Sequence, residues 1–119
     1  MQGGSAPNAK QKRWLTSIVR NGCMVCGEPA SVHHCVGTKG KHNKIAIGHE
    51  WIVPLCYEHH QGPYGIHFDL TKLQSMDGYA GLSRREIEKK LFANLVEMEK
   101  FNPELPDPLI IDTIMDYHT

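Results

Sequence analysis

Two short cysteine motifs constrain the fold of this chain more than any other feature of its sequence. The segments 23–26, CMVC, and 56–59, CYEH, each hold two potential zinc ligands separated by two residues in turn-like surroundings. A structural zinc ion takes four ligands in a tetrahedron, drawn from thiolate and imidazole groups. We therefore predict one structural Zn²⁺ site formed by Cys23, Cys26, Cys56 and His59.

The fourth cysteine leaves an alternative open. Cys35 could replace His59 as a zinc ligand, but its neighbours favour a strand rather than a metal-binding turn. We interpret Cys35 as a small buried apolar residue, which is a frequent role of a lone cysteine. The N-terminus lacks the apolar segment of a secretory signal, so we expect metal-bound or free thiols rather than disulfides.

The length of 119 residues predicts a single domain with a small core, for which a bound metal would be a plausible staple. We predict a flexible N-terminus at 1–9 and one domain at 10–119, with its core at 22–70. No apolar run reaches the roughly 18 to 20 residues that a membrane-spanning helix needs. We therefore expect no membrane partner and a cytoplasmic location.

Charge is unevenly distributed along a chain whose formal net charge is zero. Up to Lys44 the sequence has seven lysines and arginines against one acid, Glu28, whereas from Ile45 onward it has six against twelve. The basic first part is compatible with a nucleic-acid partner. An ordinary solvated surface would explain the same charges equally well.

Hydrophobic periodicity predicts an α+β fold. Residues 10–21 fit a helix with one apolar stripe. The stripe consists of Trp14, Leu15, Ile18 and Val19. The segments 31–36 and 50–56 fit two strands separated by a glycine-containing loop. A helix begins at Tyr57 but meets a Gly-Pro pair at 62–63, which should bend or break it.

The clearest helix covers 83–101, because Ser83 and Glu86 match the S-x-x-E capping box. Its apolar residues recur at helical spacing and predict a surface that faces the core. This surface consists of Ile87, Leu91, Leu95 and Met98. Residues 109–118 fit either a final helical turn or a packing arm.

Seven of the eight histidines lie between His33 and His67, where they overlap with the cysteines. The order is a C-x2-C pair, a strand carrying two histidines, a loop, a second strand, and a C-x2-H pair followed by another histidine. This order resembles the zinc-stapled form of the HNH (ββα-metal) endonuclease family. More narrowly, CMVCGEPASVHHC and IGHEWIVPLCYEHHQGPYGIH are similar to phage and prophage nucleases of the recombination-enhancement (Ref-like, RecA-dependent) type.

The resemblance implies a small ββα-metal hairpin-helix core, with a zinc knuckle, between the N-terminal and C-terminal helices. It implies that His34 is the general base and that the ligands of a catalytic divalent ion are His33, His60 and His67. The middle position of the family motif is filled by either Asn43 or His49. We prefer His49, because it lies at the predicted start of the second strand and would face the first.

The chemistry is consistent with these roles. Hydrolysis of a phosphodiester needs a base that takes a proton from water, which a near-neutral imidazole can do. It also needs a cation, for which we expect Mg²⁺ or Mn²⁺, with Zn²⁺ or Ni²⁺ as other metals that histidine accepts. On a straight helix His67 would lie roughly 10.5 Å beyond His60. The two share one ion only if the segment QGPYG folds His67 back.

We expect DNA as the partner, with contacts to its phosphates from Lys39, Lys41, Lys44 and Arg13. By resemblance, a RecA-type recombinase filament is a further candidate partner, and the cytoplasm is that of a bacterial host cell. Two alternatives stay open. One is a non-catalytic zinc-stabilised module that binds nucleic acid. The other is a zinc domain for protein contacts that uses the acidic C-terminal helix.

Overall fold

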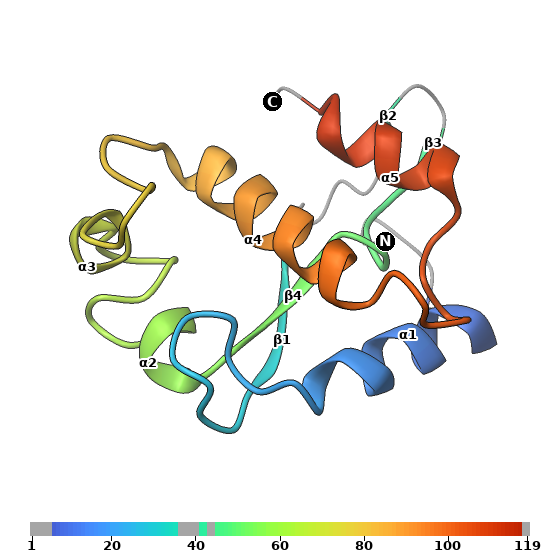
Figure 1. Ribbon diagram of the computed structural model, residues 1–119, viewed down its shortest axis with the longest axis horizontal. Helices are drawn as coiled ribbons and strands as arrows, with labels where there is room; N and C mark the ends of the chain where they lie inside the picture. The colour runs from blue at the N-terminus through green and yellow to red at the C-terminus, as the bar shows by residue number, and fades with distance from the viewer. Residues whose placement is uncertain (1–5, 36–40, 43–44, 118–119) are drawn as a thin grey trace.

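Two short antiparallel strands cross the middle of the molecule (Figure 1). The computed structural model describes residues 6–35, 41–42 and 45–117. Strand β1 (Ser31–His34) pairs with β4 (Ile52–Leu55), and the register sets His33 opposite Val53. All four residues of β4 are buried. A second, two-residue pair joins β2 (Lys41–His42) to β3 (Ile45–Ala46).

Helix α1 (Ala9–Val19) packs against both central strands. Asn8 caps the N-terminus of the helix. Its side chain accepts from the backbone N–H of Gln11, and the side-chain oxygen of Gln11 accepts from the backbone N–H of Asn8. The helix buries Trp14 and Ile18 from the predicted apolar stripe. It begins one residue earlier and ends two residues earlier than the predicted helix at 10–21.

Two helices of four residues each follow β4. Helix α2 (Tyr57–His60) starts directly after the strand and ends before the Gly-Pro pair, as the sequence predicts. Helix α3 (Thr71–Gln74) buries Leu73. Both lie at the end of the molecule opposite α5 (Figure 1). Helices this short are not stable alone, so packing and side-chain contacts must hold them in place.

The long helix α4 (Arg84–Met98) packs against β4, and α5 (Pro108–Met115) follows it near the C-terminus. The predicted capping box is present, since Ser83 accepts from the N–H of Glu86 and the Glu86 side chain accepts from the N–H of Ser83. The radius of gyration is 13.6 Å. A compact folded chain of this length has a radius of about 13.5 Å.

The predicted apolar surface of α4 is correct at three positions and wrong at the fourth. Ile87, Leu91 and Leu95 are at most 2% exposed, but Met98 is 56% exposed. The buried row continues in steps of four to Glu99, whose carboxylate accepts from the side-chain amide of Asn21 at 2.8 Å. The helix also ends at Met98, three residues before the predicted end.

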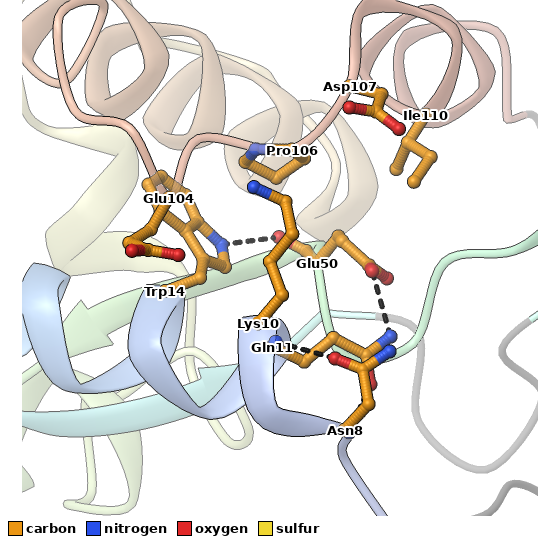
Figure 2. A pocket seen from close by; sticks show the side chains of 9 residues that line it. All are labelled: Asn8, Lys10, Gln11, Trp14, Glu50, Glu104, Pro106, Asp107 and Ile110. Atoms are coloured by element: carbon orange, nitrogen blue, oxygen red, sulfur yellow. Dashed lines mark hydrogen bonds between the residues drawn. The ribbon is translucent and has the colours of Figure 1, made fainter.

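The turn before β4 is bonded to α1, and the C-terminal segment lies beside both (Figure 2). The indole N–H of Trp14 donates to the backbone oxygen of Glu50 at 3.1 Å, and the Gln11 amide donates to the Glu50 carboxylate at 2.8 Å. A cavity of about 170 Å³ lies here, lined also by Pro106 and Ile110.

The α+β prediction is therefore confirmed at the level of a small compact domain with a two-stranded antiparallel sheet and several helices. Among the described residues, no helix is both long enough and apolar enough to cross a membrane.

Replacing Ser83 by alanine should lower the free energy of unfolding by about 1 kcal/mol, because the N–H of Glu86 loses its side-chain acceptor. Urea denaturation followed by circular dichroism would measure the change. Ser83→Thr keeps the oxygen and should lose much less. Equal stability of wild type and Ser83→Ala would mean that the cap contributes nothing in solution.

Candidate functional site

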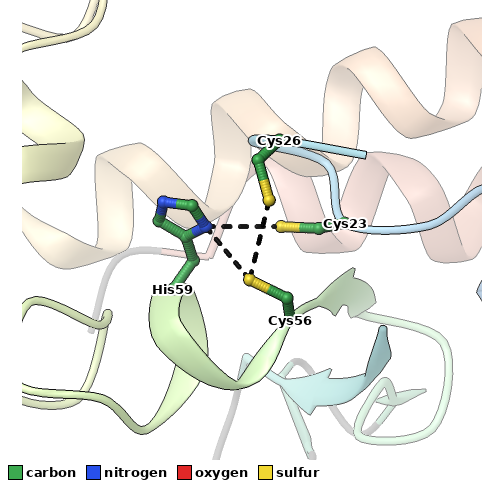
Figure 3. A group of neighbouring side chains, drawn as sticks. All are labelled: Cys23, Cys26, Cys56 and His59. Carbon is green, nitrogen blue, oxygen red and sulfur yellow. Dashed lines mark hydrogen bonds between the residues drawn. The ribbon is translucent and has the colours of Figure 1, made fainter. Parts of the chain in front are cut away.

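The four predicted zinc ligands form one cluster (Figure 3). Cys23 and Cys26 lie in the turn that follows α1, Cys56 is the N-cap of α2, and His59 lies within α2. The turn is held against β4 because the N–H of Met24 donates to the oxygen of Pro54 at 2.9 Å. The turn depends on Gly22, whose φ of 76° favours glycine. A Cβ added at this position would lie 2.5 Å from the backbone oxygen of Gly27.

The distances within this cluster fit a tetrahedral zinc ion. The sulfur of Cys26 lies 3.7 Å from that of Cys56, and Nδ1 of His59 lies 3.7 Å from the sulfur of Cys23 and 3.2 Å from that of Cys56. Sulfur ligands placed about 2.3 Å from a central ion at tetrahedral angles stand about 3.7 Å apart. The Cys₃His cluster is therefore compatible with a structural zinc, whereas Cys35 lies outside it.

Electrostatics in this cluster also favour a cation. Burial raises the pKa of the Cys23 thiol, but N–H groups of Cys56, Val25 and Cys26 lower it overall. At Cys26 the N–H of Glu28 lowers the pKa, yet burial and the nearby sulfurs of Cys56 and Cys23 raise it to about 11. Crowded sulfurs thus oppose the ionisation of Cys26, and a bound zinc ion would remove that opposition.

Three further histidines form a second cluster, at which His33, His60 and His67 bring nitrogen atoms within 4.8 Å of one another. The ring centroid of His33 lies 4.9 Å from that of His60 and 5.0 Å from that of His67, and the last two are 4.8 Å apart. His33 extends from β1 and is 1% exposed, His60 ends α2, and His67 lies in the turn beyond. We call these three residues the histidine cluster.

The turn after α2 folds His67 back in the way that the sequence predicts. The backbone N–H of Ile66 donates to the backbone oxygen of His59 at 2.8 Å, so the chain beyond α2 returns to the end of that helix. A Cβ on Gly65 would lie 2.7 Å from the backbone oxygen of His60, and one on Gly62 would lie 2.9 Å from that of Glu58. Only glycine fits such close backbone approaches.

Two imidazoles of this cluster, those of His60 and His67, are available as neutral ligands. Burial, then the charges of His33 and His67, lower the pKa of His60 to about 4. Burial and the charges of His33 and Arg84 likewise lower the pKa of His67. At neutral pH both rings therefore keep a lone pair that a metal ion can use.

The proposed base lies beside the histidine cluster rather than within it. His34 is exposed where His33 is buried, as expected for adjacent residues of a strand. Its ring centroid lies 5.9 Å from that of His49, and burial followed by the charges of His49 and His33 lowers its pKa. His49 faces β1 as predicted, but it lies in the turn that precedes β4 rather than on the strand. Asn43 is outside the described residues.

Three charged residues of α4 lie near the histidine cluster and were not predicted. Glu88 is fully buried and accepts from Nε2 of His33 at 2.7 Å, from Nε of Arg84 at 3.1 Å and from Nη1 of Arg85 at 2.8 Å. Its position precedes Leu91 by three residues, so it lies on the buried face of the helix. A carboxylate on the apolar face of the predicted helix was the sequence feature that could have identified Glu88 as a buried, partnered residue.

The cysteine outside the zinc cluster is buried next to this carboxylate. Cys35 is 1% exposed, which agrees with its interpretation as a small buried residue. Burial, followed by the charge of Glu88, raises its pKa well above the usual value. Its sulfur therefore stays protonated and behaves as a small apolar group.

The predicted DNA contacts find little support among the described residues. Arg13 is 57% exposed at its side chain and forms an ion pair with Glu104 at 3.0 Å. Lys41 belongs to β2, and nothing further is described of its side chain. Lys39 and Lys44 lie outside the described residues.

Comparison with known proteins adds no relative. A scan of protein-family models, a search of curated proteins and a search of solved structures each gave no match to the chain.

Replacing Cys26 by serine should remove one equivalent of tightly bound zinc and lower the free energy of unfolding by more than about 4 kcal/mol. Cys26 is exposed, so the substitution leaves the core unchanged and tests the metal alone. Elemental analysis and thermal denaturation would measure both effects. Cys35→Ala is the matched control and should keep its zinc. A zinc-free wild type with an unchanged melting temperature would argue against a structural metal.

Replacing Gly65 by alanine should separate His67 from His60, because the new Cβ would collide with the backbone of His60. We expect binding of Mn²⁺ to weaken by at least about tenfold, in line with the effect of disturbing ligand orientation. Calorimetric titration of the zinc-loaded protein would measure the affinity. Gly81→Ala meets no atom within 4 Å and controls for glycine replacement in a turn, although its φ of 75° adds strain. Unchanged Mn²⁺ affinity in Gly65→Ala would separate this turn from metal binding.

Proposed function

We propose that this chain is a metal-dependent DNA endonuclease that hydrolyses or nicks phosphodiester bonds. In this proposal β1, β4 and α2 form the ββα-metal core that the sequence order resembles. The Cys₃His cluster is its structural zinc site, and the histidine cluster is its catalytic metal site. The partnership with a RecA-type filament and an origin in a phage or prophage belong to the same proposal.

The observation that carries the proposal is the convergence of a second ligand set next to a separate Cys₃His cluster. A module that only binds nucleic acid needs four zinc ligands and no more. Three further imidazoles within 4.8 Å of one another, with a histidine pair beside them, have no part in that staple. Residues that converge around an open coordination position are typical of catalytic metal sites.

The donor set of the histidine cluster fits a divalent metal. Nδ1 of His33 is buried and has no hydrogen-bond partner among the described residues, while Nε2 of the same ring donates to Glu88. This is the arrangement in which one ring nitrogen binds metal and the other is held by a carboxylate. Three imidazole ligands suit Mn²⁺, Ni²⁺ or Zn²⁺ better than Mg²⁺.

The side chains around this cluster then have separate roles. A divalent ion bound there would neutralise negative charge on the phosphate and on the departing oxygen. His34 would take the proton from the attacking water, and its lowered pKa keeps the ring in the neutral form that can accept one. His49, whose ring lies edge-on to that of His34, would restrict the orientation of the base.

The alternative, a non-catalytic zinc-stabilised module that binds nucleic acid, depends on a basic surface. Arg13 is paired with Glu104, and Lys10 donates to the backbone oxygen of Pro103 at 3.3 Å. The first helix thus directs part of its positive charge toward the C-terminal segment. An endonuclease needs to bind DNA as well, so the second ligand set, rather than these contacts, favours it over the binding module.

Replacing His34 by alanine should reduce DNA cleavage by about 100-fold or more, because the water loses its base. The assay would use supercoiled, linear and single-stranded DNA, with Mg²⁺, with Mn²⁺ and without metal. Zinc content, melting temperature and Mn²⁺ affinity should stay at wild-type values, since His34 is exposed and outside both ligand sets.

His33→Ala provides the contrast, because it should lose Mn²⁺ binding together with cleavage. Cleavage by His34→Ala at the wild-type rate would exclude His34 as the base. A wild-type protein that binds DNA but cuts none of the three substrates with either metal would favour the binding module.

A further inference from the structure

Helix α4 brings a buried carboxylate to the edge of the histidine cluster. Glu88 has no exposed surface, so its charge needs internal hydrogen-bond donors. It has three: its Oε2 accepts from His33 and Arg84, and its Oε1 accepts from Arg85. Charge-assisted bonds of this kind fix the carboxylate and the donors around it.

The two arginines that meet Glu88 differ in their surroundings. Arg85 also donates from Nη1 to the backbone oxygen of Cys35, and its guanidinium stacks over the rings of Trp51 at 4.9 Å and Tyr117 at 5.2 Å. These contacts give Arg85 a packing role, although its buried Nε has no hydrogen-bond partner among the described residues. Arg84 keeps 41% of its side chain exposed and meets Glu88 through Nε alone.

The free end of Arg84 lies next to the histidine cluster. Nε of Arg84 and Nε2 of His33 bind the same oxygen atom of Glu88, at 3.1 Å and 2.7 Å. The Nη groups of Arg84 have no hydrogen-bond acceptor within the part of the chain that the structure describes. A planar guanidinium with two free NH₂ groups is the side chain best suited to bind a phosphate in two places.

We propose that Arg84 binds the phosphate of the substrate, and that Glu88 is a positioning residue for both Arg84 and His33. This inference rests on the proposed function, because it takes the histidine cluster as the place where the phosphodiester reacts. One carboxylate faces two guanidinium groups, so this side of the cluster carries excess positive charge. The ligand class is a phosphate group, whatever bases are attached to it.

The inference also assigns the atoms of His33. An ionised carboxylate only accepts hydrogen bonds, so the proton of the His33 ring lies on Nε2. Nδ1 is buried and has no hydrogen-bond partner among the described residues, so it is the ring nitrogen left for a metal ion. The Oε2 atom of Glu88 thus orients the ring of His33 and holds Arg84 beside it.

The test compares Arg84→Ala and Arg84→Lys with Lys90→Ala. Lys90 carries the same charge on the same helix, but its ammonium lies over the ring of Tyr79, at 5.2 Å. The probe is inorganic phosphate added to zinc-loaded protein that also holds Mn²⁺, followed by the broadening of the phosphorus resonance. We expect Arg84→Ala to bind phosphate at least about tenfold more weakly, with Arg84→Lys between it and wild type.

Two measurements separate this role from a structural one. Mn²⁺ affinity should stay unchanged in both Arg84 variants, because Arg84 does not ligate the ion. The melting temperature should fall only slightly, because Glu88 keeps His33 and Arg85 as donors. Glu88→Gln should weaken Mn²⁺ binding about 10- to 100-fold, as loss of a partner to a ligating histidine does. Since Glu88 is buried and its variant could fail to fold, the Arg84 variants decide the question alone.

The outcomes distinguish this inference from the proposed function. Wild-type phosphate affinity in Arg84→Ala, or no phosphate binding by the wild type, overturns the inference. If the wild type cleaves DNA and Arg84→Ala cleaves at the same rate with the same KM, the inference also fails while the endonuclease stands. If phosphate binding depends on Arg84 but no DNA is cleaved, the endonuclease fails and the phosphate site stands.

Discussion

The position of α2 is the constraint on which the rest of the site depends. This helix has four residues and cannot hold its shape alone. It is fixed at its first residue by β4, which ends at Leu55, and by Cys56 and His59, which face the turn after α1. Because His60 follows His59 directly, the zinc cluster also determines where the histidine cluster begins.

One strand separates two chemical environments. His33 and His34 are neighbours, yet one ring is 1% exposed and contacts the histidine cluster, while the other is exposed and meets His49. The alternation of side chains along a strand produces this division without any distortion of the backbone. The proposed hydrolysis requires this arrangement, since water must reach His34 as the base and must be kept from displacing His33 as the ligand.

The local parts of this structure were predictable from the sequence. Motifs with short spacing identified the Cys₃His cluster and the cap at Ser83, because their geometry depends on a few adjacent residues. The Gly-Pro pair likewise indicated that α2 would end early. The convergence of His67 with His60 was predictable only on the condition that the intervening turn folds back, and the turn meets it through Gly62 and Gly65.

Contacts between distant segments were not predictable from periodicity. A carboxylate on the apolar face of a helix indicates that Glu88 has a partner, but only the folded structure shows that the partner is His33. Met98 fits the apolar spacing but faces solvent, because the neighbouring Glu99 turns inward to bind Arg20 and Asn21 just after α1. The uneven charge along the sequence is also explained by contacts between distant segments. Basic residues of the first part form ion pairs with acidic residues of the second part, Arg13 with Glu104 and Arg20 with Glu99.

The bond between His33 and Glu88 has a consequence for the order in which the site is completed during synthesis. It joins residues 55 positions apart, whereas the residues of the Cys₃His cluster are at most 36 apart and all precede Glu88 in the chain. Chains emerge from the ribosome N-terminus first, and early segments can begin to fold before later ones exist. We expect a nascent chain to close the zinc cluster first and to acquire the acceptor for His33 only with α4. The Cys₃His cluster would therefore form before His33 has its acceptor, and so before the histidine cluster is complete.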